Sequence, residues 1–392
     1  MKRPLTLSVL ALYLTVLLTS GCLRKDTELM KIDESVVSDA DIVAIIDLAS
    51  AKKTPLYTNL EKKTENTPES IKKKQRDEKL KQATGITEND ITRILVSADL
   101  DKIPSMSNLQ NTVDGTESGI DKVPILAAFC LSKKIDIIKL KAGIKIILDE
   151  QGDFAMVERK IADQDVIVAK SSITNSASSY FALDKSGRKI LLTSNEETLT
   201  QYLTARKANA KASNVEKLIE TEKNIPPSAQ FRIAFVLSES MNKRMKAAII
   251  DMQKETKNDP TAAMGINFLR PFQELKSVVV SGTMASNMIL AAKCDLGNDM
   301  CANEAKDVLQ STLMMISMFT TQQQETGDQA NFLNKIKLSS ENQFLKVDLT
   351  ANDADFEKLK EMQNDIMPMT GIDVSPANSK KSAPENRKGT AK

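Results

Sequence analysis

Short apolar stretches alternate with polar segments along the chain and predict a series of strands and helices. The run at 42–48 is short, apolar and rich in β-branched residues, which is typical of a buried strand. Thr54 and Pro55 follow it as a helix N-cap and a first helical residue. Further strands are predicted at 91–100, 124–131, 231–237 and 344–349, and hairpins at 154–170, 180–193 and 278–294.

Helices are predicted where apolar residues recur three or four positions apart. After the helix that opens at Pro55, such segments lie at 137–148, 194–203, 241–254, 261–273 and 302–320, and around Phe356, Leu359 and Met362. The segment 62–82 is almost wholly polar and is predicted to be a solvated helix extension or a surface loop. The β-branched residues of 137–148 make a strand a competing interpretation, but their spacing favours a helix.

This order of elements predicts an α+β fold, with antiparallel sheet covered by helices on one face. A polar connector at 208–228 separates a first α+β unit at 35–207 from a second one at 229–370. Both units begin with a buried strand and a helix, continue with extended pairs and end with a strand and a helix. A diverged internal duplication would explain this order, although the halves share no clear residue-level identity. A disordered basic tail is predicted at 371–392.

The first 22 residues predict the destination of the protein. Lys2 and Arg3 precede an apolar run at 5–18, which is shorter than a membrane-spanning helix and has the length of the apolar region of a secretory signal. The small residues Ser20 and Gly21 then precede Cys22. This arrangement resembles the N-terminus of bacterial lipoproteins, in which the signal peptide is removed and the cysteine becomes the lipidated first residue.

The resemblance covers only residues 1–22, and it implies an address without an activity. It implies a signal peptide at 1–21, a diacylated Cys22 as the membrane anchor and a tether at 22–34. In such proteins of two-membrane bacteria, an aspartate after the cysteine commonly retains the chain in the inner membrane. Leu23 occupies that position here, which favours the outer membrane facing the periplasm.

The composition excludes several classes of mechanism. The chain has no histidine, which rules out a Ser–His–Asp triad, a Cys–His pair and an HExxH zinc site within it. It has no tryptophan and only 4% aromatic residues, which argues against a carbohydrate-binding surface. The formal net charge is +2, and cleavage before Cys22 would remove Lys2 and Arg3, so no overall basic charge would attract nucleic acid.

Cys294 and Cys301 flank a turn-rich loop between a predicted strand and a predicted helix. In an oxidising compartment such a spacing is readily closed, so a disulfide is predicted between them. The polar residues of this loop are Asp295, Asn298, Asp299 and Glu304. Their spacing does not match a calcium-binding EF-hand, so a turn and helix cap is predicted, and no metal site or cofactor is expected. Cys130 is expected to be a buried small hydrophobe.

Two other patterns carry candidate chemistry. The motif S-x-x-K, which begins the active site of penicillin-binding serine enzymes, occurs at Ser70–Lys73, Ser186–Lys189 and Ser240–Lys243. A chain this rich in serine and lysine contains the motif by chance, and the companion K-T-G is absent. Met314, Met315 and Met318 on the last long helix would suit a flexible apolar groove, but core packing is their expected use.

These features leave three functions open. The expected one is a membrane-anchored envelope lipoprotein that acts as a non-catalytic binding or structural module. The alternative is a carrier of a lipid or another apolar ligand, and a histidine-free Ser–Lys hydrolase is the least supported. The expected partners are the membrane, through lipidated Cys22, and an envelope protein or an apolar ligand. The sequence does not identify the envelope protein or the apolar ligand.

Overall fold

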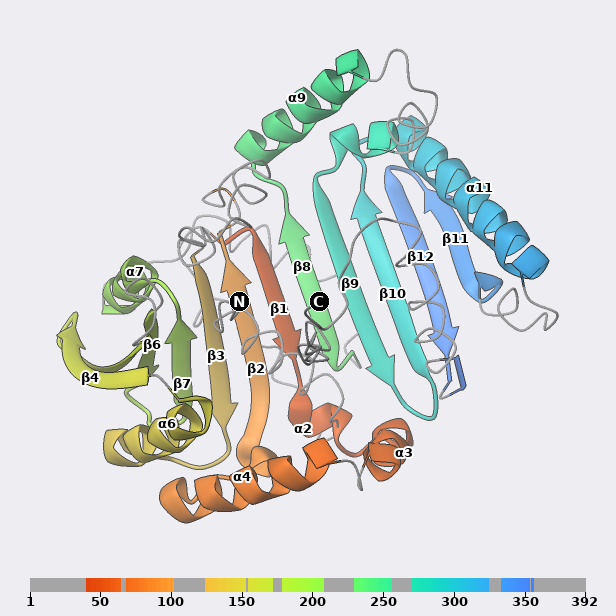
Figure 1. Cartoon of the computed structure of the whole chain (residues 1–392). Coiled ribbons are helices and arrows are strands. Elements are labelled where there is room, and N and C mark those ends of the chain that lie inside the picture. Colours follow the sequence, from red (N-terminus) through yellow and green to blue (C-terminus); the bar gives the residue numbers. More distant parts are fainter. Residues whose placement is uncertain are drawn as a thin grey trace, which may run out of the picture.

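The computed structural model describes residues 40–64, 68–99, 101, 124–152, 154–171, 178–207, 229–255, 269–323, 333–352 and 354–355. Its centre is a twelve-stranded sheet in which every pair of neighbouring strands is antiparallel. Figure 1 shows this sheet face-on, with helices along its ends and sides. The chain is therefore α+β, as the sequence predicts.

The strands are β1 (Ile42–Ile46), β2 (Ile91–Ala98), β3 (Ile125–Leu131), β4 (Phe154–Ile161), β5 (Gln164–Ser171), β6 (Ser178–Leu183), β7 (Lys189–Thr193), β8 (Phe231–Val236), β9 (Ser277–Met284), β10 (Met288–Asp295), β11 (Ile336–Glu341) and β12 (Phe344–Ala351). The helices are α2 (Leu48–Ala51), α3 (Pro55–Thr64), α4 (Pro68–Thr84), α6 (Ile137–Gln151), α7 (Glu196–Lys207), α9 (Glu239–Glu255) and α11 (Asp299–Gln323), and two 3₁₀ turns are η2 (Glu88–Asp90) and η6 (Arg270–Glu274). Across the sheet the order is β11-β12-β10-β9-β8-β1-β2-β3-β7-β6-β5-β4.

Strands β1 and β8 lie side by side inside the sheet and join the two predicted units. Five residue pairs connect them, from Ile42 opposite Phe235 to Ile46 opposite Phe231. Outwards from this pair the halves follow one order, because β2, β3, β7 and β6 correspond to β9, β10, β12 and β11. This matching order supports the proposal of an internal duplication, in which the β4–β5 hairpin is an addition to the first half.

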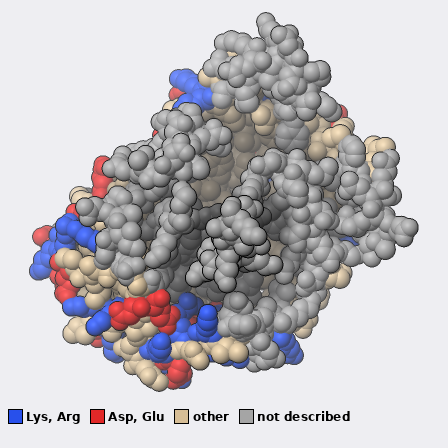
Figure 2. All heavy atoms as spheres, viewed as in Figure 1, with Lys and Arg blue, Asp and Glu red and all other residues tan. Residues whose placement is uncertain are grey.

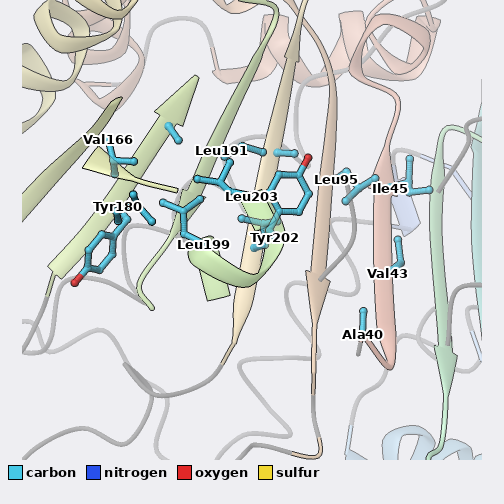
Figure 3. Close-up of a cluster of buried hydrophobic side chains, with 14 of the residues drawn as sticks. Ala40, Val43, Ile45, Leu95, Val166, Tyr180, Leu191, Leu199, Tyr202 and Leu203 are labelled. Atoms are coloured by element: carbon cyan, nitrogen blue, oxygen red, sulfur yellow. The ribbon is translucent and has the colours of Figure 1, made fainter. Parts of the chain in front are cut away.

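Helices cover both faces of the sheet, so the expectation that they cover one face is wrong. In β5, Val166 and Val168 pack into the largest hydrophobic cluster together with Leu199 of α7. The residue between them, Ile167, packs with Leu140 of α6 instead. Alternate residues of a strand point to opposite faces, so α6 and α7 lie on opposite faces. Figure 3 shows α7 against the sheet residues of this cluster.

Most predicted elements are confirmed, and the differences have local causes. The helix at 137–148 is α6, and the Asp136 carboxylate caps it by accepting a hydrogen bond from the Lys139 backbone N–H at 2.8 Å. Helix α7 is capped by Asn195 rather than Ser194, since the Thr198 N–H donates to the Asn195 side chain. Strand β11 was not predicted, because only its first half, at Ile336 and Leu338, is apolar.

Several predicted segments lie outside the described residues. They are the signal peptide, the tether, the connector at 208–228, the first part of the helix at 261–273, the helix around Phe356, Leu359 and Met362, and the tail at 371–392. Within the described part of the chain, no helix combines the length and the apolar character needed to cross a membrane.

Candidate functional site

A half-buried group of charged side chains lies where α2, α4 and η2 meet. We call it the Glu88 cluster, and it consists of Lys52, Lys73, Arg76, Asp77 and Glu88. Lys52 follows the last turn of α2, while three members lie on α4 at spacings of three and four residues, which places them on one side of that helix. Glu88 opens the turn η2, directly before β2.

Glu88 holds two lysines from different elements. Its Oε2 lies 2.6 Å from Lys73 Nζ, and its Oε1 lies 3.7 Å from Lys52 Nζ. The Lys52 ammonium also donates a hydrogen bond of 2.9 Å to the Glu88 backbone carbonyl. The three side chains are only 15–30% exposed, so water screens these attractions less than it screens an ion pair on the open surface.

The cluster shifts the pKa of two of its members. Burial lowers the pKa of Lys52, and the charge of Glu88 opposes that shift. Burial raises the pKa of Asp77, and the nearby Glu88 carboxylate raises it further. Arg76 Nε and Glu88 Oε1 are buried atoms without a hydrogen-bond partner in the part of the chain that the structure describes. Shifted titration and unsatisfied polar atoms together make this cluster a candidate binding site.

A second carboxylate, that of Asp90, lies beside the cluster and anchors the turn that carries Glu88. Asp90, the last residue of η2, accepts hydrogen bonds from Thr87 N–H and Oγ1, from Ser132 Oγ and from Lys133 Nζ. Burial acts to raise the pKa of Asp90, but these hydrogen bonds outweigh it and lower the pKa. The turn η2 is therefore capped, and the hydrogen bond from Ser132 to Asp90 links the end of β3 to the start of β2.

The surface around this cluster carries both signs of charge. Figure 2 shows Lys and Arg side chains interspersed with Asp and Glu side chains over α4 and α6. An ion pair between Lys79 Nζ of α4 and Glu150 Oε1 of α6, at 3.2 Å, connects the two helices. The mixture suits a small ligand that itself carries both donors and acceptors more than it suits a polyanion.

Each S-x-x-K pair has a member that is held by a carboxylate. Lys73 is bound to Glu88 and Lys243 to Glu239, at 2.6 and 2.7 Å. The hydroxyl of Ser186 donates to Asp184 at 2.8 Å. The sequence singles out Lys73 for its spacing to Ser70. It gives no sign of the partner Glu88, because that residue lies on another element.

The predicted Cys294–Cys301 disulfide is not formed in the structure, in which both residues are free thiols. Cys294 is held in β10, and Cys301 lies in the first turn of α11. The turn between them is ordered without a cross-link, because Asn298 Oδ1 accepts from the Cys301 N–H at 2.9 Å and Asp295 accepts from the Gly297 N–H. The predicted turn and helix cap is thus confirmed. Burial raises the pKa of the Cys294 thiol to about 11.

The disulfide stays a prediction for the exported chain, because both cysteines pack against one small hydrophobic cluster. In protein isolated without reductant and then denatured, we expect Cys294 and Cys301 to resist alkylation while Cys130 reacts. Reduction should lower the free energy of unfolding by about 2 kcal/mol, as expected for a short loop. A Cys130→Ser variant serves as the control and should behave like the parent. Alkylation of both residues before reduction would refute the pairing.

The remaining candidates are placed as follows. Cys22 lies outside the described residues. Cys130 is half-buried in β3, and burial raises the pKa of its thiol. Met314, Met315 and Met318 are exposed, so the expectation of core packing is wrong for them. They point away from the side of α11 on which Leu309 and Leu313 pack against the sheet.

Among the described residues, no group of three or more His, Cys, Asp or Glu side chains is placed to hold a metal ion. No protein-family model matches the chain, and comparisons with curated proteins and with solved structures gave no significant match.

Proposed function

We propose that the protein is an envelope lipoprotein, anchored by a lipid on Cys22, that acts as a non-catalytic binding or structural module. The observation that carries the second part is the β1–β8 pair, which makes one sheet of both halves. A continuous sheet of this width, with α4 tied to the turn η2 before β2 by the Lys73–Glu88 ion pair, suits a supporting role. The address is supported by the resemblance of residues 1–22 to lipoprotein signals.

The contacts of the S-x-x-K lysines support a non-catalytic role. A Ser–Lys mechanism requires a lysine that can accept the serine proton, as an adjacent general base does in other nucleophilic enzymes. Lys73 and Lys243 instead form ion pairs with the carboxylates of Glu88 and Glu239. A fluorophosphonate probe, which labels activated serines, is therefore expected to leave the chain unmodified. Labelling of Ser70, Ser186 or Ser240 would contradict the proposal.

The anchor is tested by replacing Cys22 with serine in the full chain. The parent is expected in the membrane fraction, released by detergent and labelled by radioactive palmitate. The Cys22→Ser variant should be unlabelled and should leave the membrane fraction, because the acyl chains supply the apolar surface that enters the bilayer. Cys130→Ser, a matched substitution within the sheet, should keep the anchor. If Cys22→Ser stays with the membrane after a high-salt wash, the lipid assignment is wrong.

A further inference from the structure

Three methionines form an exposed patch near the C-terminal end of α11. Met314, Met315 and Met318 have 61%, 41% and 62% of their surface exposed. Met314 and Met318 are four residues apart, and Met315 and Met318 are three apart, so each of these pairs consists of neighbours on the helix surface. The three side chains therefore start from the corners of a small triangle. We call it the Met314 triangle.

The exposure of this triangle is not explained by the packing of α11. The helix packs on β11, β12 and η6 through its other side, where Leu309 and Leu313 contact buried residues of the sheet. In its first half, the exposed positions Asn303, Glu304 and Asp307 are polar, as expected for a surface helix. Met300 is also exposed at the start of the helix, and in the second half Met314, Met315 and Met318 are the exposed large apolar side chains among those that the structure describes.

The chemistry of the side chain distinguishes methionine from other apolar residues. A thioether sulfur is a soft, neutral ligand that selects Cu(I), whereas oxygen ligands suit Mg²⁺ and Ca²⁺. The side chain has several rotatable bonds, so three sulfurs that start from neighbouring positions can converge on one ion. Between Asp307 and Gln323 the helix has no charged residue, so nothing on that stretch repels a cation or attracts a hard one.

The geometry points to a surface site for Cu(I), formed by the thioethers of Met314, Met315 and Met318. No histidine in the chain competes for the ion. None of the described cysteines, Cys130, Cys294 and Cys301, is as exposed as the three methionines, and burial raises the pKa of the Cys130 and Cys294 thiols. This leaves the triangle as an exposed group of soft donors that needs no deprotonation, and Cu(I) binding there should be independent of pH between about 5 and 8.

Met300 supplies a matched control on the same helix. Its side chain is 71% exposed, but no methionine lies three or four residues away from it. It has the same donor atom and a similar environment without a second or third ligand. A single thioether should not retain the ion against a competing chelator.

The test uses the full chain, purified in detergent, with ¹³C-labelled methionine methyl groups. Ag(I), which binds the same soft ligands as Cu(I) and is not oxidised by air, is used for the NMR titration. In a second experiment Cu(I) is titrated without oxygen in competition with the chelator bicinchoninate. We expect the methyl signals of Met314, Met315 and Met318 to shift together and to stop shifting at one ion per chain, while the signal of Met300 stays in place. Single Met→Leu variants assign the signals.

The decisive variant replaces all three residues with leucine, which keeps the patch apolar and removes the sulfur. It should lose saturable Cu(I) binding, and Met300→Leu should bind as the parent does. The site is wrong if the triple variant competes with bicinchoninate as well as the parent, or if the ion binds while the three methyl signals stay in place, as it would at thiols. A patch that serves only to dock another apolar surface would give no metal-dependent shift at all, which also overturns the proposal.

Discussion

Deletion of residues 229–392 is expected to leave the first half of the chain unable to fold. The deletion removes β8, whose residues Ala234 and Val236 belong to the same hydrophobic cluster as Val43 and Ile45 of β1. It also removes the ion pair of 2.6 Å between Arg244 and Asp101. The net free energy of unfolding of a protein is only about 5–15 kcal/mol. The loss of part of the hydrophobic cluster and of the β1–β8 hydrogen bonds should therefore leave the fragment unfolded.

The deletion would also expose the edge of an entirely apolar strand. β1 has the sequence Ile-Val-Ala-Ile-Ile, and without β8 its backbone donors and acceptors would face solvent on one side. Such an edge pairs with other chains, so the fragment should aggregate or elute as a broad oligomer in size-exclusion chromatography.

The matching experiment on the intact chain is urea unfolding followed by two probes. One fluorophore is placed on an exposed site of α6 and another on α11, and both transitions should have the same midpoint. Two separated midpoints, or a soluble fragment with a sharp thermal transition, would show that the halves fold independently and would contradict the expectation.

Replacement of Glu88 with glutamine is expected to lower the free energy of unfolding by about 2–3 kcal/mol. Removal of one partner of a fully buried ion pair costs about 3–5 kcal/mol, and the partial exposure of Lys73 and Glu88 reduces that figure. The variant keeps the size of the side chain and the backbone carbonyl that Lys52 contacts. What it loses is the negative charge that compensates the two ammonium groups.

The loss of stability in Glu88→Gln is expected to depend on pH. Burial already holds the pKa of Lys52 below its ordinary value, and the loss of Glu88 should lower it further. The unfolded chain then binds more protons than the folded one as the pH approaches the ordinary lysine range, so the stability of the variant should rise relative to the parent. The deficit should therefore shrink in alkaline buffer.

A control for Glu88→Gln exists on the surface of the same molecule. Glu239 and Lys243 form an i,i+4 pair on α9 in which the side chains are 85% and 74% exposed. Glu239→Gln should leave the free energy of unfolding nearly unchanged, because solvent screens this exposed pair. Chemical denaturation of both variants at neutral and alkaline pH decides the matter. Equal losses in the two variants would mean that the Glu88 cluster behaves as an ordinary surface.

The sequence was sufficient for elements whose signal is local. Asp136 caps the predicted helix at 137–148, and the apolar run at 42–48 contains β1. It was also sufficient for the α+β class, because short extended runs next to each other pair as hairpins. These features depend on residues within a few positions of each other.

Features that depend on distant residues could not be predicted in this way. Lys52, Lys73 and Glu88 meet because α2, α4 and the turn η2 lie together, and no spacing within one element records that contact. On α11, apolar residues occupy more than one side of the second half, so periodicity alone could not show that Met315 faces solvent while Leu313 faces the sheet. In β5, by contrast, the unbroken run at 166–169 was a readable sign of burial on both faces.

The position of β1 inside the sheet also decides how the molecule carries mechanical load. Under the proposed anchoring, tension between the envelope and anything that the module holds reaches β1 from the N-terminal side of the chain and acts along this strand. This strand has five paired residues with β2 and five with β8. Tension along it must shear both ladders at once, whereas tension on an edge strand such as β4 would open a single ladder one bond at a time. An anchor on the N-terminal side of β1 would thus let the sheet resist being pulled open by tension from the membrane.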